Sequence, residues 1–555
     1  MKLFRILLTG FIALAFFTTA CDDMLDVDHD NVLLEENHRM TSPNDTIHSM
    51  VGILSELEHL AERFVVLGEL RGDLLEASPT ASVPLKEIAE FSVSPGNPYA
   101  DTRDYYSVIN RCNLLIDRID TAIVSRGQKV MYKEFAAAKA IRAWTYLQLA
   151  LNHGSVKYYE KPLTSIQDAA AIQEGIVLSD LLPKLIADLA PYQDVALPGS
   201  MQLGDDIVDS RKLYFPIRMV LGDLYLYNGQ YEQAAQAYYD LMVQGAYLST
   251  DNYQSEWEVV NSVFTSFYAS WSLVHELDFA ASEKITMIAG SSELGNGFRL
   301  DSLFMVRREM APTQVAIDNW ERQTYYHTLN VNTSGDLRGA YSSYWDQEYF
   351  EMYHQMVLNQ EVPSDLSGNV VAKYRSMGTD ETWGVQIYRV GMLYLRYAEA
   401  INRAGKPASA FAVLKNGLSA QTLANDNLIP VWEKTPLASW MNFNASRLNL
   451  GATSNLSTIG IHGRGNGNIQ LSEDYSVPEL SSLSDSILFV EDLILEEMAL
   501  ELAFEGHRFH DLMRIAWRRN DPGFLARKVA AKNEDAAGLE ALLNNESNWY
   551  LPNEH

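Results

Sequence analysis

The stretch EMALELAFEGHRFHDLMR, residues 497–514, carries the most information about the fold. Glu497, Glu501 and Glu505 recur at every fourth position, so a helix would place three carboxylates on one face. Carboxylates this close repel one another unless cations neutralise them, and arginine can pair with a carboxylate through two hydrogen bonds. The stretch itself supplies two such cations, Arg508 and Arg514. We therefore predict one strong helix over about 485–518, followed only by a short tail.

A helix pair is predicted upstream, over residues 103–154. Residues on one face recur at helical spacing in both halves: Tyr105, Ile109, Cys112, Ile116 and Ile119, then Ala136, Ala140, Ala143, Leu147 and Ala150. The small side chains of the second half allow close helix packing, and Gly154 is placed to end that helix. Cys112 lies on the apolar face, so we interpret it as a core residue rather than a reactive thiol.

A repeat follows the helix pair. The first unit has the spacing of a tetratricopeptide motif at Leu221-Gly222, Tyr225, Ala234 and Tyr238. A shift of 176 residues places a second unit at Tyr397-Ala398, Ile401, Ala410 and Leu414. Gly229 and Gly405 would form the turns, and Pro407 suits the first turn of a helix. The predicted fold class is mainly α, with tetratricopeptide-like helix pairs supporting a less regular, loop-rich lobe with little β structure.

That lobe is expected at about 246–385 and 420–485, where the helical period breaks. Both stretches are rich in Gly, Ser, Asn, Thr and aromatic residues, and they hold seven of the ten tryptophans: Trp257, Trp271, Trp320, Trp345, Trp383, Trp432 and Trp440. Long irregular segments on a rigid scaffold are usually functional.

Residues 1–20 have the features of an export signal. Two basic residues precede an apolar run at 6–17, which is too short to cross a hydrocarbon core of about twenty residues. Small residues then lead directly to Cys21, and this arrangement resembles the lipobox of bacterial lipoproteins, whose cysteine is lipidated. A plain secretory signal followed by an incidental cysteine is the alternative. The acidic stretch 21–45 is expected to be a solvated tether.

The cysteine content argues against a disulfide framework, and the net charge argues against a nucleic acid partner. The chain has two cysteines, so lipidation of Cys21 would leave Cys112 without an intrachain disulfide partner. The net charge is −29, and it becomes −31 once the two basic residues of the signal are removed. Such a charge repels phosphate backbones, so no nucleic acid partner is expected.

Taken in order, these features resemble the SusD/RagB family of Bacteroidetes outer-membrane nutrient-binding lipoproteins. Residues 497–514 are similar to the C-terminal signature of that family, with Met498 where the family commonly has arginine. Shorter similar segments follow in the family's order: Cys21-Asp-Asp-Met-Leu-Asp, then 69–73, 106–113, 140–144 and 394–405. The resemblance places a SusD-like N-terminal region with helical repeats at 46–320 and a SusD/RagB-like C-terminal region at 321–555.

The resemblance also implies a location and a partner. Members are lipid-anchored at the cell surface on the outer membrane, cover a SusC-like TonB-dependent barrel, and hand over oligosaccharides or, in some members, peptides. The expected function is therefore capture of an oligosaccharide or polysaccharide for such a transporter, with a peptide as the alternative ligand. The signature residues are structural in that family, so we expect no binding role for Glu497, Glu501, Glu505 or Arg508.

Motifs for chemistry are lacking, so no enzymatic activity and no cofactor are expected. His507, His510 and Asp511 share a helix face, but no third metal ligand with a recognisable spacing accompanies them, and no metal is expected. Glycoside hydrolysis needs only a pair of carboxylates, and 72 acidic residues offer many pairs. A surface glycoside hydrolase therefore stays open as an alternative, as does a scaffold that binds only proteins.

Aromatic and amide side chains in irregular segments are the candidate ligand contacts, because an aromatic ring can cover the flat C–H face of a sugar. The candidates are Asn97, Tyr99, Trp320, Tyr325 and Trp345. If the ligand is a glycan, one or two of Trp320, Trp345 and Tyr99 should be exposed. The alternative interpretation of each is an ordinary core residue.

Overall fold

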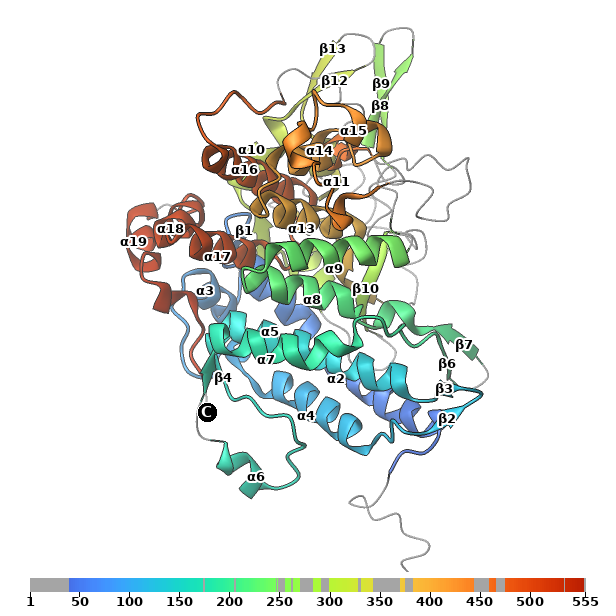
Figure 1. The fold of residues 1–555 in the computed structure, drawn as a ribbon. Coiled ribbons are helices and arrows are strands. Elements are labelled where there is room, and N and C mark those ends of the chain that lie inside the picture. The colour runs from blue at the N-terminus through green and yellow to red at the C-terminus, as the bar shows by residue number, and fades with distance from the viewer. Residues whose placement is uncertain are drawn as a thin grey trace, which may run out of the picture.

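The structure is a computed structural model, and it describes residues 39–172, 175–203, 206–245, 247, 255–260, 263–269, 283–290, 299–327, 331–342, 370–374, 383–443, 459–465, 475–533 and 535–553. Helices dominate these residues, and their strands pair two by two. Figure 1 shows the helices in successive layers, with α4 near the bottom and α14 and α16 near the top. The predicted mainly α fold with little β structure is confirmed.

The lower layers contain the first predicted helix pair. Residues 103–154 form α4 (Arg103–Arg118) and α5 (Tyr132–His153), and Gly154 ends α5 with a φ of 75°. The long helix α2 (Pro43–Glu69) packs against both helices of the pair. The other elements of this part are β1 (Leu75–Ala77), α3 (Val83–Ala89), η2 (Pro98–Ala100), β2 (Val124–Ser125), β3 (Gln128–Lys129), β4 (Ser155–Val156), α6 (Ile166–Ala171), β5 (Ile176–Val177), α7 (Leu178–Leu189), η3 (Ala190–Tyr192), β6 (Ser200–Leu203), β7 (Asp206–Asp209) and η4 (Ser210–Leu213).

Both predicted repeat units are helix pairs: α8 (Ile217–Tyr227) with α9 (Tyr231–Gln244), and α13 (Val390–Arg403) with α14 (Pro407–Lys415). The turns contain Gly229 and Gly405, with φ of 73° and 84°, values that favour glycine. Gly222 explains the close crossing in the first pair, because a Cβ there would lie 2.3 Å from the ring of Tyr238. Helix α9 also packs against α13, so the two units adjoin.

The less regular lobe consists of short elements. Its described members are β8 (Ser255–Val260), β9 (Val263–Ala269), β10 (Lys284–Gly290), η7 (Ser302–Val306), β11 (Met310–Pro312), α10 (Gln314–Glu321), β12 (Thr324–His327), β13 (Val331–Ser334), α11 (Leu337–Ser342), β14 (Trp383–Arg389), α15 (Ala420–Ala424), η8 (Val431–Glu433), η9 (Ser439–Met441) and η11 (Ile461–Gly465). The antiparallel pair β10–β14 leads directly into α13, which fixes the lobe to the second repeat unit.

The single C-terminal helix predicted over 485–518 is wrong. The chain forms α16 (Leu483–Glu501) and α17 (Arg508–Arg519), separated by a turn. Phe504 and Gly506 have φ of 70° and 91° there, outside the helical range. The carboxylate of Glu69 stabilises the turn by accepting hydrogen bonds from backbone N–H groups of Phe504, Gly506, His507 and Arg508 at 2.8–3.3 Å.

The predicted short tail is also wrong, because the chain after α17 continues as helices. These are α18 (Pro522–Ala530), α19 (Ala536–Leu543) and η12 (Glu546–Trp549). Buried apolar residues of α17, α18 and α19, together with Trp549, form a small core of their own beside the main one. Asn520 ends α17 in a left-handed conformation, and Pro522 then begins α18, so the break is built into the sequence.

A buried ion pair links the start of α17 to Asp73, which follows α2 in the sequence. Arg508 at the start of α17 binds Asp73 through two hydrogen bonds, of 2.6 and 2.8 Å, and neither side chain is accessible to solvent beyond a few per cent. Arg508 also donates to the carbonyl of Leu495 at 3.0 Å. The glycines that face each other across this contact are Gly68 and Gly506: a Cβ on Gly68 would lie 1.9 Å from the carbonyl oxygen of Gly506.

The interpretation of Cys112 as a core residue is confirmed, since it is fully buried and burial raises the pKa of its thiol to about 12. Cys21 and most of the predicted tether lie outside the described residues. The division at 320/321 stays a prediction; α10 runs across it. In the ranges that the structure describes, no helix has both the length and the apolar character needed to cross a membrane.

We predict that Gly68→Ala lowers the free energy of unfolding by about 1–3 kcal/mol, the range for overpacking, because the new methyl group would clash with backbone atoms that cannot move away easily. Gly52→Ala in the same helix is the matched control: its Cβ meets only a flexible arginine end at 3.4 Å, so a gain of about 0.5–1 kcal/mol is expected. Denaturant titration of both variants measures the difference. Equal effects of the two substitutions would mean that α2 does not contact the backbone of Gly506 at Gly68.

We predict that Arg508→Ala lowers the free energy of unfolding by about 3–5 kcal/mol, since Asp73 would stay buried without its partner. Arg527→Ala is the control, because its pair with Asp521 is exposed at the surface and should be worth less than about 1 kcal/mol. Thermal and denaturant unfolding of the purified variants would measure both values. Unchanged stability of Arg508→Ala would contradict the structural role given to this residue.

Candidate functional site

The two predicted contact residues near the first long helices are buried and hydrogen-bonded within the chain. Asn97 accepts from the N–H of Tyr99 at 3.0 Å and donates to Glu87 at 2.8 Å, which fixes the short helix η2. The Tyr99 hydroxyl donates to Glu62 at 2.9 Å, and burial raises the pKa of Tyr99 above its ordinary value. These side chains are 4% and 8% exposed, so this turn offers a ligand little accessible area.

The other described candidates lie together, in a different part of the molecule. The indole N–H of Trp320 donates to the carbonyl of Leu500 at 3.1 Å, and the Tyr325 hydroxyl donates to Asp336. Both rings are buried. Trp345 lies outside the described residues. One or two of Trp320, Trp345 and Tyr99 were expected to be exposed. Trp320 and Tyr99 are buried, because backbone and carboxylate partners hold these side chains in the interior. The expectation for Trp345, like a binding role for the five candidates, stays a prediction.

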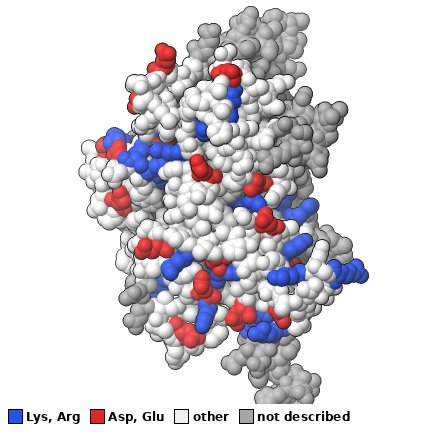
Figure 2. Space-filling model, in the orientation of Figure 1, with Lys and Arg blue, Asp and Glu red and all other residues white. Residues whose placement is uncertain are grey.

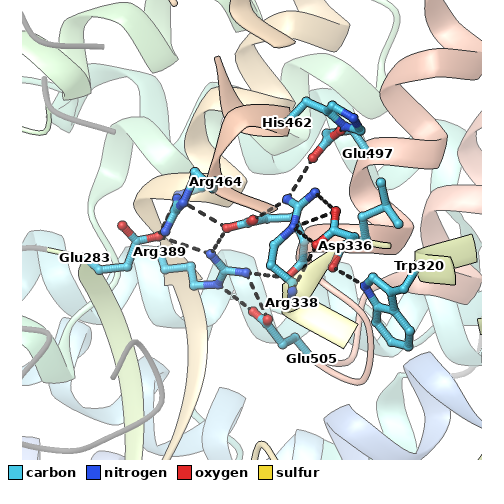
Figure 3. A network of polar contacts seen from close by, with 12 residues as sticks. Glu283, Trp320, Asp336, Arg338, Arg389, His462, Arg464, Glu497 and Glu505 are labelled. Carbon is cyan, nitrogen blue, oxygen red and sulfur yellow. Dashed lines mark hydrogen bonds and ion pairs between the residues drawn. The ribbon is translucent and has the colours of Figure 1, made fainter. Parts of the chain in front are cut away.

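The glutamate stripe is the centre of a buried charge network, shown in Figure 3. Arg338 of α11 binds Glu497 at 2.8 Å and Glu501 at 2.7 Å through one terminal nitrogen. It is held in place by Asp336, whose carboxylate it meets at 2.6 Å. The guanidinium therefore neutralises two neighbouring carboxylates of α16, as the repulsion between them requires.

Arg389 neutralises the other end of the stripe. Its guanidinium lies 2.6 Å from a carboxylate oxygen of Glu501 and 2.7 Å from one of Glu505. Lys373 adds a second cation to Glu505 at 2.7 Å. Arg464 of η11 approaches Glu501 at 3.2 Å and, together with Arg389, also contacts Glu283 just before β10. The cations of the stripe thus come from four separate segments of the lobe.

The arginines that follow the stripe in the sequence have other partners. Arg508 binds Asp73, and Arg514 binds Glu399 of α13 through two hydrogen bonds of 2.6 and 2.8 Å. The expectation that these two arginines could pair with the stripe is wrong. The chain turns between α16 and α17, so the side chains of the second helix no longer follow the face that carries the stripe.

Neighbouring cations lower the pKa values of two carboxylates of the stripe. Burial alone would raise the pKa of Glu501, but the charges of Arg464, Arg389 and Arg338 outweigh it and hold that pKa well below the ordinary value. For Glu497, Arg338 and the ring of His462 likewise outweigh burial and lower the pKa. A general acid needs the opposite shift, towards neutral pH. These carboxylates are suited to stability rather than to proton transfer.

The histidines of the signature do not converge on a common point. The ring of His507 packs edge-on against Phe64, and Nε2 of His510 lies 3.2 Å from the amide oxygen of Asn152. Burial lowers the pKa of both imidazoles. Across the described residues, no group of three or more His, Cys, Asp or Glu side chains is arranged to hold a metal ion.

A small cavity lies between α5, α8, α13 and α17. It measures about 20 Å³, room for about one water molecule. Its lining is polar on one side, with Asp223, Arg396, His507 and His510, and aromatic on the other, with Trp144 and Tyr227. A sugar ring or a peptide side chain does not fit, so this cavity is not a ligand site.

One exposed tryptophan is not among the ligand contacts predicted from the sequence. Of the tryptophans whose side chains the structure describes, Trp432 alone is exposed, with 52% of its surface accessible. It belongs to η8, in a segment with three other exposed apolar side chains: Leu428, Val431 and Leu437. We call residues 428–437 the apolar turn. Pro430 and Pro436 on either side of Trp432 were the available sequence signal, because prolines keep a short segment out of a helix or strand.

Comparison with known proteins relates this fold to one family. Residues 472–553, which contain the stripe and helices α16 to α19, match the model of the SusD family. No curated protein matches the sequence. Among solved structures, a SusD superfamily protein from Bacteroides vulgatus has a TM-score of 0.55 at 15% identity, covering 89% of this chain and 91% of that one.

Two structures from Bacteroides thetaiotaomicron are similar in the same way. One is a SusD superfamily protein with a TM-score of 0.55, at 14% identity over 86% of this chain and 89% of that chain. The other is surface glycan-binding protein A in complex with laminarihexaose, with a TM-score of 0.52, at 16% identity over 92% and 96% of the two chains. The SusD family model thus covers the signature helices, residues 472–553, and the chain as a whole shares the fold of the SusD superfamily structures.

Proposed function

We propose that the protein is a nutrient-binding lipoprotein of the cell surface, which captures an oligosaccharide or polysaccharide and delivers it to a SusC-like TonB-dependent transporter in the outer membrane. The observation that carries this proposal is the fold. A surface glycan-binding protein shares it over 92% of this chain, and that protein was solved with laminarihexaose. The export signal at 1–20 and the cysteine that follows it directly, Cys21, support a lipid anchor.

Binding without chemistry agrees with the electrostatics of the glutamate stripe. The carboxylates of the stripe are each neutralised by arginine or lysine in the interior, and their pKa values, where shifted, are lowered rather than raised. Glycoside hydrolysis needs one carboxylic acid that keeps its proton near neutral pH beside the bond to be cleaved. The stripe therefore does not support the hydrolase alternative, and a peptide ligand stays as the second candidate.

The net charge opposes an anionic ligand and is compatible with a neutral one. The mature chain carries about −31, and on the face drawn in Figure 2 acidic and basic side chains are interspersed rather than gathered into one patch. Long-range steering of a charged ligand needs a surface of one sign. Recognition of a neutral sugar depends instead on contacts of short range, which salt screens little.

We predict that the mature chain, produced without Cys21, binds at least one neutral glycan in a titration against a panel of polysaccharides, oligosaccharides and peptides. Calorimetry at low and at high salt should give nearly the same affinity, because a neutral sugar releases no counterions. Analysis of the sugar after long incubation should show no cleavage. Binding confined to cationic peptides would favour the peptide ligand, cleavage would favour the hydrolase, and absence of any small ligand would favour a protein scaffold.

We predict that Cys21→Ala releases the protein from the membrane fraction, because the tether contains no other anchoring segment. Stable anchoring of a lipoprotein needs more than one acyl chain, since a single chain binds only marginally. Cys112→Ala is the control: this thiol is buried in the fold and its replacement should leave the protein in the membrane fraction. A Cys21→Ala protein that stayed membrane-bound in high salt would contradict the lipid anchor.

A further inference from the structure

The apolar turn is exposed although its backbone is held firmly. Glu433, next to Trp432, is fully buried and accepts hydrogen bonds from the N–H groups of Ala408 and Ser409, both at 2.8 Å. It also accepts from the Ser409 hydroxyl at 2.7 Å. These donors lie in the first turn of α14, where a negative charge is favourable. Trp432 is thus presented on a turn that is anchored to the second repeat unit.

The next residue anchors the turn on its other side. The ammonium of Lys434 donates to the carbonyl of Leu423 at 2.6 Å and pairs with Asp426 at 2.9 Å. This fixes Trp432 relative to the end of α15 and to the polar, exposed residues 425–427. A backbone turn held in this way loses little conformational freedom when a ligand binds to it, which favours a preformed contact site.

One cation lies near the indole, and further polar groups are exposed on the segment to which Lys434 is bound. The ammonium of Lys406 lies 5.9 Å from the ring centroid of Trp432, and Asn425, Asp426 and Asn427 are exposed beside Lys434. An aromatic ring covers the C–H face of a pyranose, while ammonium, amide and carboxylate groups bind its hydroxyls. Ligand sites commonly combine an apolar surface with a few fixed polar groups in this way.

The position of the turn suits a ligand that arrives from outside. Figure 1 places α14 and α15 in the upper part of the molecule, below β8, β9, β12 and β13, whereas α4 lies near the bottom. The described chain enters beside α4, since Met40 bridges to Ile119 just after that helix. A tether that begins at Cys21 would therefore anchor the lower end. The contacts of Glu433 and Lys434 with α14 and α15 keep the turn at the opposite end.

We propose that Trp432 is the stacking platform of a glycan subsite on the apolar turn, which takes one pyranose ring of a polysaccharide at the end of the molecule remote from the anchor. The subsite rests on the proposed function, since it supplies an additional contact for the same class of ligand. It is separate from the buried candidates Tyr99, Trp320 and Tyr325, none of which belongs to this turn.

The test uses the mature chain without its lipid and a panel of neutral glycans that includes laminarihexaose. Trp432→Ala should weaken binding of a glycan by about tenfold or more, as expected for an aromatic hot spot. Trp432→Phe should keep most of the affinity but lose the part of the ligand-induced fluorescence change that comes from this indole. Leu437→Ala, an exposed apolar residue of the same turn, is the matched control and should bind like the wild type. Unfolding temperatures should be unchanged in all three.

Two results would overturn the subsite while leaving the proposed function intact. One is wild-type affinity of Trp432→Ala for every glycan that the wild type binds. The other is an equal loss in Trp432→Ala and Leu437→Ala, which would mean that the turn acts through its apolar area, as a protein contact does, and not through stacking. If the wild type binds no glycan at all, the proposed function fails, and the subsite fails with it.

Discussion

Pairing of buried charges is the constraint on which the rest of this structure depends. Taking a carboxylate out of water costs several kcal/mol unless a cation and hydrogen bonds replace the water. Helix α16 and the turn after it bury three glutamates, and the guanidinium groups that neutralise them come from α11, the end of β14 and η11. None of these short segments has a large core of its own. The ion pair that each segment forms with α16, or with the turn after it, holds the segment in position.

This constraint also explains how a helical scaffold can carry an irregular lobe. The pair β10–β14 places Glu283 beside Arg389, and Arg389 in turn reaches Glu501 and Glu505. Displacement of any of these segments would take at least one ion pair away from a buried charge. The network therefore fixes the position of the lobe relative to the helical scaffold.

The helix pairs could be predicted from the sequence because their causes are local. Gly222 permits the crossing with Tyr238, and Gly229 and Gly405 make turns that other residues form only with strain. The need for cations beside the glutamate stripe was also predictable. Their identity was not, because Arg338 is 159 residues from Glu497, and nothing in the local pattern encodes that contact.

The break between α16 and α17 was missed although Gly506 marked it, because the helical period of the glutamates continues through the turn. The candidate contacts show a similar limit. Trp320 and Tyr325 were chosen by residue type, but whether a ring is buried depends on what packs against it, here Phe504 and His462. Glu69 shows a further consequence of distant contacts. This carboxylate at the end of α2 is satisfied by amide groups more than 430 residues later in the sequence, so its partners come from the far end of the chain. Burial of Glu69 therefore depends on the turn at 504–508, and a chain without this turn would leave the carboxylate at the end of α2 without its four backbone donors.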